Sequence, residues 1–328
     1  MSSHPVSDTL LAEVVQALHM HGTQSAAARA LGLSRQGLQG RLQKAQERGI
    51  VVEIDEAPAE KPRVRVRAYN PDTVRDMPYR RVVVIGDLHR KPGLTVEPMK
   101  WIGRYVAETR PDNVVQIGDF LDMESCEFHS PPGSASHAKR PAFIEDIEAG
   151  EDALCEYHKE VGTGEIPHDE VYGNHEYRAN RLEELAPNLA GSLVMKMDEM
   201  FSRYRWKVTP YRHWLFLEGV GFTHVPHTIM GRPIGGRYPE QNIGNQSTHS
   251  IIFGHTHRWN HVTVPKIGVN NSITVTNVGS AMPYGYTPKY TDGATTGYSY
   301  GIADLRLRGG RVESANFISM ADLEEKFK

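Results

Sequence analysis

The chain has 328 residues, of which 39% are apolar and 23% are charged, and its formal net charge is −3. This composition is typical of a globular protein with ample material for a core, and the charge excludes a chain that is basic throughout. No apolar run approaches the roughly 18 residues that cross a bilayer, and the N-terminal segment lacks a basic region and a small-residue cleavage site. Two cysteines, Cys126 and Cys155, are too few for a disulfide framework. We therefore expect reduced thiols in a cytoplasmic protein that does not contact membranes.

Residues 8–48 have the pattern of short helices. The apolar residues of the first helix recur at spacings of three and four on one face: Leu10, Leu11, Val14, Val15 and Leu18. A second, alanine-rich helix is expected to end at Gly32. Ser34 is the expected N-cap of a third helix. Short helices joined by the turn LGLS have the dimensions of a helix-turn-helix.

The segment GTQSAAARALGLSRQGLQGRLQKA resembles the Fis-type helix-turn-helix of bacterial regulators. The resemblance implies a small all-α domain that binds DNA, over residues 1–49, and five arginines and lysines against one glutamate between residues 23 and 48 agree with it. The residues expected to contact bases or phosphates are Arg35, Gln36, Gln39 and Arg41. The alternative is a helical dimerisation or docking module, which would make an oligomer, because Gly37 and Gly40 each cost the third helix about 1 kcal/mol relative to alanine.

Residues 50–80 are expected to link two domains. The stretch DEAPAEKP is an acidic, proline-rich spacer, and the stretch RVRVRAY that follows alternates with a period of two. This alternation predicts a half-buried edge strand with three arginines on its outer face. That face is either a solvated strand surface or a basic stripe for nucleic acid.

Residues 81–328 form a third region, in which short apolar strands end in polar residues. The expected strands are RRVVVIGDLH, NVVQIGDFLD, EVYGNHE, WLFLEGVGFTHV, SIIFGHTH and ITVTNVGS. Two expected helices, EPMKWIGRYVAE and FIEDIEAGEDALCEYHKEV, lie between the earlier strands. Alternation of strands and helices predicts an α/β sheet, and ligands of such sheets bind at the carboxyl ends of strands.

Polar side chains with metal-binding donors occur at five of these strand ends. They are Asp87 and His89, Asp119 and Asp122, Asn174 and His175, His224, and His255 and His257. Oxygen and nitrogen donors without thiolate suit Mn²⁺, Fe or Zn²⁺. The set exceeds what one tetrahedral ion requires, so two ions that share a carboxylate would use it.

This ordered set resembles the calcineurin-like metallophosphoesterases over roughly Arg81 to Asp304. The resemblance implies a four-layer α/β/β/α sandwich with two divalent metal ions, for which Mn²⁺ is favoured over Fe or Zn²⁺. It also implies hydrolysis of phosphate esters by a hydroxide that bridges the metals. The implied ligands are Asp87, His89 and His257 for the first metal, Asp119 as the bridge, and Asn174, His224 and His255 for the second.

His175 is then left outside the metal shell, where it could donate a proton to the leaving group. Asp122 matches the position from which some family members orient this histidine, and a carboxylate there would keep the imidazole protonated. The alternative is that Asp122 is a helix N-cap or a surface acid. Phosphoprotein phosphatases have Asp-Arg-Gly after this motif, whereas Met123 and Glu124 follow here. Arg178 is either a substitute phosphate clamp or a surface helix residue.

Three loops rich in basic residues or tyrosine are expected around the substrate. They contain His129, His137, Lys139 and Arg140; His227, Arg232 and Arg237; and the tyrosines of residues 279–300. Basic residues with interleaved tyrosines suit a phosphate backbone with stacked bases, although ordinary surface loops have the same composition. We favour a DNA-directed phosphodiesterase or nuclease of phage or bacterial origin. The alternatives are a phosphomonoesterase on phosphoprotein or nucleotide, and a DNA-binding regulator with an auxiliary phosphoesterase domain.

Overall fold

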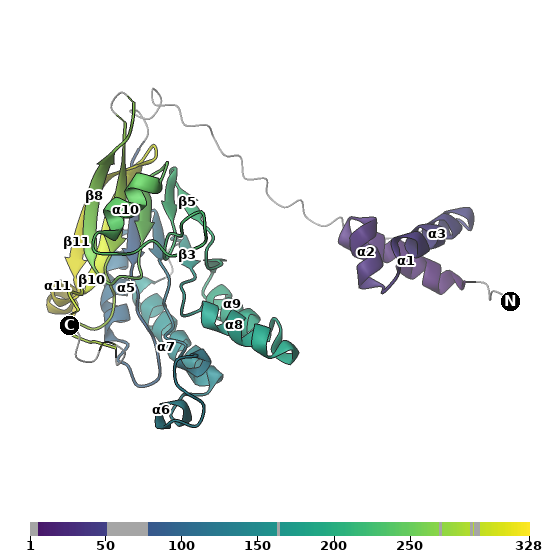
Figure 1. The fold of residues 1–328 in the computed structure, drawn as a ribbon, viewed down its shortest axis with the longest axis horizontal. Helices are drawn as coiled ribbons and strands as arrows, with labels where there is room; N and C mark the ends of the chain where they lie inside the picture. Colours follow the sequence, from purple (N-terminus) through teal and green to yellow (C-terminus); the bar gives the residue numbers. More distant parts are fainter. Residues whose placement is uncertain (1–5, 51–77, 163–164, 269–270, 289–290, 292–295) are drawn as a thin grey trace. The chain divides into compact units, whose positions relative to one another are not determined.

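The computed structural model describes residues 6–50, 78–162, 165–268, 271–288, 291 and 296–328 (Figure 1). The chain divides into two compact units, Met1–Arg67 and Ala68–Lys328. The expected edge strand RVRVRAY and its spacer lie outside the described residues, as does nearly all of the expected linker. Among the helices of the described ranges, none is both long and apolar enough to cross a membrane.

The N-terminal unit contains α1 (Asp8–His21), α2 (Gln24–Ala30) and α3 (Arg35–Glu47). Ser34 is the N-cap of α3, and its hydroxyl accepts a hydrogen bond from the backbone N–H of Gly37 at 3.1 Å, which confirms the expected cap. The three helices enclose a small core of Val14, Ala17, Ala27, Ala28 and Leu38, with Leu18, Leu31, Leu33 and Leu42 at its margin. Leu10 is 42% exposed and does not belong to that core, contrary to its expected place on the apolar face.

The first sheet of the C-terminal unit has six strands in the order β11-β10-β1-β2-β3-β4. Their bounds are β1 Arg80–Ile85, β2 Asn113–Gln116, β3 His168–Val171, β4 Trp206–Thr209, β10 Gly301–Arg308 and β11 Arg311–Ser319. Strands β1 to β4 are parallel, and β10 and β11 are antiparallel neighbours at one side. The carboxyl ends of β1, β2 and β3 therefore meet at one edge of this sheet.

The second sheet has five strands in the order β5-β6-β7-β9-β8. Their bounds are β5 Leu215–Leu217, β6 Val220–Phe222, β7 Ile251–Phe253, β8 Trp259–Pro265 and β9 Ser272–Val278. The expected strand WLFLEGVGFTHV is a hairpin of β5 and β6 instead of one strand. Glu218 and Gly219 turn the chain with φ of 50° and 78°, as a two-residue turn between antiparallel strands requires.

Three apolar clusters hold the C-terminal unit together. Side chains from both sheets, among them Val84, Val115, Phe222 and Ile252, form one buried cluster, so the sheets pack face to face. The opposite face of the first sheet packs against α5 (Glu97–Thr109), α7 (Phe143–Val161), α9 (Ser192–Arg203) and α11 (Met320–Phe327). Successive residues of β1 point to opposite sheet faces, which is why Val83 joins the helices while Val84 joins the other sheet.

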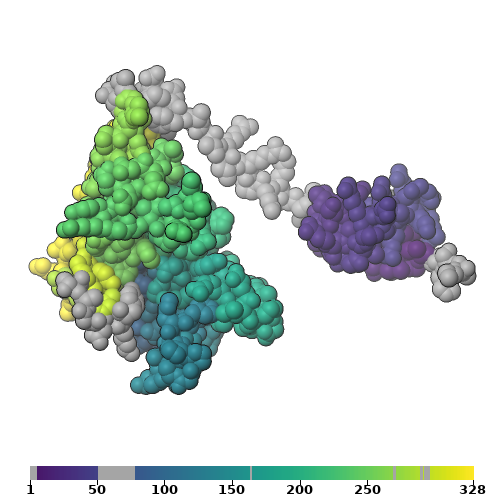
Figure 2. Space-filling model, viewed as in Figure 1, coloured from purple at the N-terminus to yellow at the C-terminus, as the bar shows by residue number. Residues whose placement is uncertain are grey.

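The remaining elements lie on the second sheet and around the ends of the first. Helix α10 (Pro239–Gln246) contributes Ile243 to a third cluster with β7 and β9. The others are η1 (Glu124–Cys126), α6 (Ala135–Ala138), α8 (Tyr177–Leu185) and η2 (Pro187–Leu189). The segment around α6 and the pair α8 and α9 form two projections of the C-terminal unit, as the space-filling view shows (Figure 2).

Candidate metal centre and adjoining cavity

The seven predicted metal ligands lie in five loops that directly follow strands. Asp87 and His89 follow β1, Asp119 follows β2, Asn174 follows β3, His224 follows β6, and His255 and His257 follow β7. Because the two sheets pack face to face, strand ends from both sheets meet at one edge of the sandwich. The structure brings all seven side chains into two adjoining groups.

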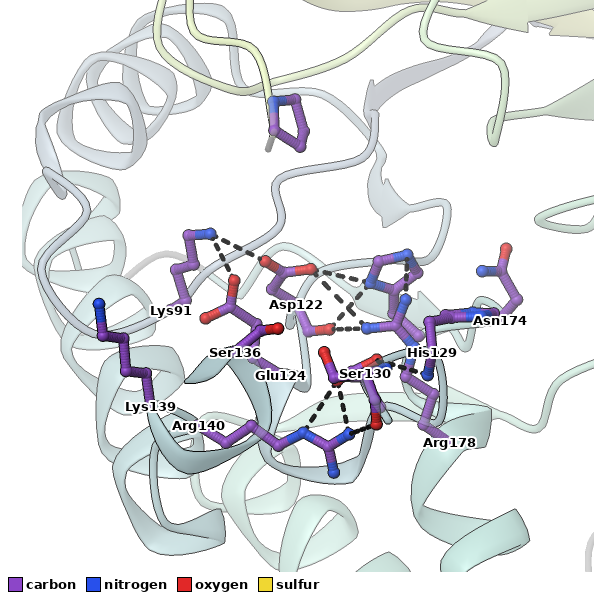
Figure 3. A pocket seen from close by; sticks show the side chains of 13 residues that line it. Lys91, Asp122, Glu124, His129, Ser130, Ser136, Lys139, Arg140, Asn174 and Arg178 are labelled. Carbon is purple, nitrogen blue, oxygen red and sulfur yellow. Dashed lines mark hydrogen bonds and ion pairs between the residues drawn. The ribbon is translucent and has the colours of Figure 1, made fainter. Parts of the chain in front are cut away.

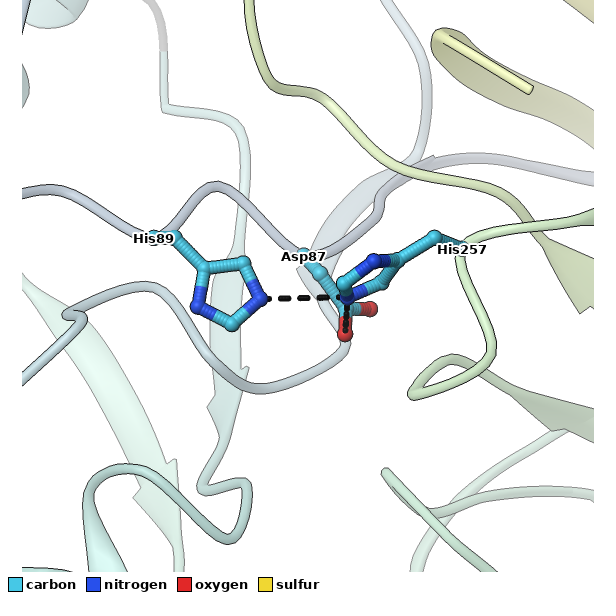
Figure 4. Close-up of side chains that lie close together, drawn as sticks. All are labelled: Asp87, His89 and His257. Carbon is cyan, nitrogen blue, oxygen red and sulfur yellow. Dashed lines mark hydrogen bonds and ion pairs between the residues drawn. The ribbon is translucent and has the colours of Figure 1, made fainter. Parts of the chain in front are cut away.

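The first group consists of Asp87, His89 and His257, whose donor atoms lie within 4.8 Å of one another (Figure 4). The Asp87 Oδ2 atom is 3.0 Å from His257 Nε2, and the Nε2 atoms of His89 and His257 are 3.1 Å apart. Oxygen and imidazole nitrogen donors that face each other so closely suit a divalent cation of the first transition row.

The second group consists of Asp119, His224 and His255. The His224 Nε2 atom lies 3.2 Å from Asp119 Oδ2 and 3.1 Å from the side-chain oxygen of Asn174, so Asn174 adjoins this group as well. Asp119 also forms a cluster with His89 and with His175. Its carboxylate therefore lies between the two groups, where a bridging ligand would have to be.

Backbone N–H groups fix the orientation of both aspartates. The N–H of His255 donates to Asp87 Oδ1 at 3.0 Å, and the N–H of His175 donates to Asp119 Oδ1 at 2.9 Å. Each carboxylate thus keeps its Oδ2 atom toward the histidines. His224 Nδ1 lies 2.9 Å from the carbonyl oxygen of Ile117, which fixes the ring with Nε2 facing the group, as is usual for metal-binding histidines.

The glycines of the strand-end motifs allow this close approach. A Cβ atom on Gly173 would lie 2.1 Å from Asp119 Oδ1, and one on Gly254 would lie 2.6 Å from Asp87 Oδ1. Four of the predicted ligands also have positive φ, which is uncommon outside glycine: His89, Asp119, His255 and His257. Such backbone conformations concentrate at functional sites, because the surrounding structure has to enforce them.

The charges of the site fit a cation. Burial raises the pKa of the Asp119 carboxyl group, but the neighbouring His224 and His175 outweigh burial and lower it well below its usual value. Burial lowers the pKa of His224, whereas Asp119 and Asp87 raise it to about 10 overall. Asp87 Oδ2 is buried, and among the described residues it has no hydrogen-bond partner besides its 3.0 Å contact with His257 Nε2. A divalent cation would satisfy this oxygen and would take the place of the His224 proton.

His175 and Asp122 are in contact beside the two groups. His175 Nδ1 lies 2.8 Å from the carbonyl oxygen of Asp122 and 3.0 Å from its Oδ1 atom. Burial lowers the pKa of His175, but Asp119 and Asp122 raise it above its usual value. Asp122 is buried, and η1 begins two residues later with Met123 as its N-cap. Asp122 is therefore neither a helix N-cap nor a surface acid.

Arg178 lies in the first turn of α8 and contacts the same two residues. Its Nη1 donates to the carbonyl oxygen of Asp122 at 2.7 Å, and its Nη2 is 3.0 Å from His175 Nε2. Since a guanidinium only donates hydrogen bonds, His175 Nε2 is the acceptor in this contact. Arg178 is thus half-buried at the site rather than a solvated helix residue.

A cavity of about 620 Å³ adjoins His175. In Figure 3, Lys91, Asp122 and Glu124 line one side of it, and Arg178 and Asn174 line another. Of the loops expected around the substrate, the one near α6 contributes His129, Lys139 and Arg140 to the wall, but Arg140 is paired with Glu127. The expected residues His137, His227, Arg232 and Arg237 do not line this cavity.

Several residues near the site were not predicted from the sequence. Lys91 Nζ is 3.2 Å from Asp122 Oδ2, and its position two residues after His89 was a signal that could have been used. Tyr177, Arg181, Tyr211 and Arg212 line a second cavity next to Asn174. No sequence pattern pointed to Tyr211 and Arg212, because they follow β4, a strand that was not expected.

No protein-family model matches the chain, and no curated protein matches it. A dimetal phosphatase from Danio rerio is among the solved structures with some likeness to it, at 11% identity and a TM-score of 0.36. The match covers 74% of this chain and 100% of the phosphatase chain. A likeness at this level establishes neither fold nor function, which therefore depend on the geometry described above.

Proposed function

We propose that the chain is a phosphoesterase that depends on two divalent metal ions, for which Mn²⁺ is the favoured identity. One observation carries this proposal: two groups of carboxylate and imidazole donors adjoin each other, and Asp119 of the second group also clusters with His89 of the first. Asp87, His89 and His257 would hold the first ion, and Asn174, His224 and His255 the second. The three apolar clusters support the related interpretation that the C-terminal unit is a four-layer metallophosphoesterase sandwich.

Two bound ions would polarise the phosphate oxygens of a substrate and lower the pKa of water at the site. The protein's own groups would then act on the leaving group. His175 would be its proton donor, with Asp122 holding Nδ1 of the ring. Arg178 would bind a phosphate oxygen, because its guanidinium faces the cavity that adjoins the metal groups.

The contact between Arg178 and His175 suggests that Arg178 binds phosphate before His175 donates its proton. Arg178 donates to His175 Nε2, so this nitrogen carries no proton while that contact is made. An anionic phosphate would attract the guanidinium, and Nε2 would then be free to carry a proton. Phosphate binding would thereby prepare His175 for its role as general acid.

Within the phosphoesterases, we favour a phosphodiesterase acting on nucleic acid. Two features support this choice. The arginine of the Asp-Arg-Gly motif of phosphoprotein phosphatases is missing, since Met123 follows Asp122. The N-terminal unit also presents Arg35, Gln36 and Gln39 as exposed side chains on α3, from which they could reach DNA, while Arg41 on the same helix is half-buried.

The test is a comparison of substrates with purified protein and Mn²⁺. Bis-p-nitrophenyl phosphate is a small diester, p-nitrophenyl phosphate is a monoester, and single- and double-stranded DNA are the polymeric substrates. We expect turnover of the diester and cleavage of DNA. Turnover of the monoester alone, with intact DNA, would reject the nuclease assignment and favour a phosphomonoesterase.

A companion experiment assigns the role of His175. His175→Ala should keep its bound metal, because the ring contacts Asp122 and Arg178 rather than only the ligand groups. Turnover of a diester with a poor leaving group should fall by about 10²–10⁴-fold, the usual contribution of a general acid. Loss of metal from this variant would instead make His175 a ligand, as its cluster with His89 and Asp119 would allow.

A further inference from the structure

A second cavity, of about 390 Å³, lies beside Asn174. Its wall consists of His129, Asn174, Tyr177, Arg178, Arg181, Glu184, Tyr211 and Arg212. His129, Asn174 and Arg178 also line the larger cavity next to His175, so the two cavities adjoin at these residues. A substrate at the metal groups thus has room to continue in two directions.

The second cavity is positively charged. Its wall contains three arginines, Arg178, Arg181 and Arg212, and one acid, Glu184. Among the described residues, neither Arg181 nor Arg212 forms a salt bridge, and both are exposed. Unpaired guanidiniums next to a phosphoesterase site favour a substrate with more than one phosphate.

Aromatic rings hold these guanidiniums in place. Arg212 lies 5.8 Å from the ring of Tyr177 and 5.5 Å from the ring of Tyr211, and Arg181 lies 4.5 Å from the ring of Phe128. A guanidinium that stacks on a ring keeps its N–H groups directed sideways, where they can bind phosphate oxygens. Arg181 and Arg212 are exposed, but each lies against a ring that restricts where its guanidinium can be.

Tyr177 and Tyr211 form the apolar part of the wall. Their ring centroids are 5.0 Å apart with an interplanar angle of 37°, and both residues are half-buried. Tyr177 begins α8, whereas Tyr211 follows β4, so two separate segments build this pair. The Tyr211 hydroxyl lies 3.5 Å from His227 Nε2, which further restrains its ring.

We propose that the cavity at Tyr177 and Tyr211 binds single-stranded nucleic acid. It would hold the nucleotide next to the scissile phosphate. One base stacks on the tyrosine pair, and the neighbouring phosphate lies against Arg181 and Arg212. The strand continues past Asn174 into the larger cavity. A phosphopeptide would use the arginines but has no base to stack on the tyrosines. This inference rests on the proposed phosphoesterase function and names its substrate class.

The kinetic test compares a short single-stranded oligonucleotide with bis-p-nitrophenyl phosphate, which is too small to extend into the cavity. Tyr211→Leu should lower kcat/KM for the oligonucleotide by about tenfold, because stacking of one base is lost. The small diester should change by less than about twofold, since its contacts lie at the metal groups. Tyr211→Phe keeps the ring and should retain wild-type activity on both. Equal losses on both substrates, or no loss on either, would overturn the proposal.

Arg212 provides an electrostatic test. Arg212→Asn is chosen because Arg212 has a φ of 68°, which asparagine tolerates. If Arg212 contacts one phosphate, the slope of log KM for the oligonucleotide against log salt concentration should decrease by about 0.7 in the variant. An unchanged slope would exclude the contact. Arg237→Asn is the matched control for Arg212→Asn, and Tyr238→Leu is the control for Tyr211→Leu. The guanidinium of Arg237 lies 5.5 Å from the centre of the Tyr238 ring, as Arg212 does from Tyr211, but neither residue lines the cavity.

Photo-cross-linking tests the cavity without depending on turnover. Oligonucleotides carrying 5-iodouracil, one set of DNA and one of RNA, would be irradiated with the metal-loaded full chain and the cross-linked peptides identified. We expect Tyr177 or Tyr211 among the linked residues, and the set that reacts identifies the type of strand. Links only to other residues would overturn the proposal. If the small diester is not hydrolysed although Tyr211 is linked, the phosphoesterase function fails while the binding site stands.

Discussion

Asp122 lies between the two groups of expected metal ligands and the cavity next to His175. Its carboxylate lies 3.0 Å from His175 Nδ1, 3.5 Å from His89 Nδ1 and 3.2 Å from Lys91 Nζ. It is buried, which raises its pKa, but His175 and His89 outweigh burial and hold the pKa below the usual range. Asp122 therefore stays ionised and orients both an expected ligand and the expected proton donor.

This arrangement predicts a change in pH dependence. Because Asp122 helps to raise the pKa of His175, Asp122→Asn should lower that pKa. A general acid must be protonated, so the alkaline limit of kcat for a diester with a poor leaving group should move to lower pH. Bis-p-nitrophenyl phosphate, whose leaving group needs no proton, serves as the control and should keep its limit. An unmoved or raised limit for the poor leaving group would contradict the pairing.

Among single residues, the sequence predicted the expected metal ligands, because each belongs to a motif at the end of a strand. All seven expected ligands lie together, because each directly follows a strand of one of two packed sheets. Tyr211 and Arg212 were beyond prediction, because they meet Tyr177 only through the packing of the loop after β4 against α8. Contacts between distant segments have no local pattern.

At the scale of elements, Glu176 links the loops after β2 and β3. Its carboxylate accepts hydrogen bonds from the backbone N–H groups of Gly173 at 2.8 Å, Asp119 at 3.0 Å and Leu121 at 2.8 Å. The first two bonds share Oε2, and the third uses Oε1. The loop that carries Asp119 is thereby fixed to the loop that carries Asn174.

Glu176→Gln replaces one acceptor oxygen with a donor, which leaves at least one buried N–H without a partner. The variant should lose about 1–3 kcal/mol of unfolding free energy and should bind metal more weakly, as urea titration and metal titration would measure. Glu183→Gln is the matched control. Glu183 also accepts from three backbone N–H groups, of Gly191, Leu193 and Val194, but at the start of α9. An equal loss of metal affinity in both variants would contradict the proposed role of Glu176 in fixing the loops of Asp119 and Asn174.

The elements that the sequence predicted share a strong local pattern. Helix α7 covers the residues expected for it, and the expected strands before the site motifs are present. Strand β4 was missed because only Trp206 among its four residues is buried, so its alternation is weak. The hairpin of β5 and β6 was taken for one strand, because both halves are apolar and only the two turn residues Glu218 and Gly219 separate them.

At the scale of the whole molecule, two compact units carry different expected roles. The N-terminal unit has the three helices that the sequence predicted, and they enclose a small core. Its Fis-type character and DNA binding remain predictions. They can be tested apart from hydrolysis, because the metal groups lie entirely in the other unit.

Two substitutions on α3 separate phosphate contacts from base contacts. If Arg35 binds a phosphate, Arg35→Gln should weaken binding to every duplex and reduce the slope of log affinity against log salt by about 0.9. Gln39→Ala should leave the slope unchanged and alter sequence preference, if Gln39 contacts a base edge. Fluorescence anisotropy at several salt concentrations measures both effects, and hydrolysis of the small diester should be unaffected. Unchanged DNA binding in both variants would favour a docking module.

We expect two divalent ions to bind side by side and to share Asp119 as a ligand. Equilibrium dialysis against Mn²⁺, followed by elemental analysis, counts the ions bound per chain. We expect two for the wild type, one for His255→Ala, and fewer than two for Asp119→Ala, because the bridging carboxylate offsets the repulsion between the ions. A wild-type chain that binds a single ion at saturation, or an Asp119→Ala variant that still binds two, would contradict the claim.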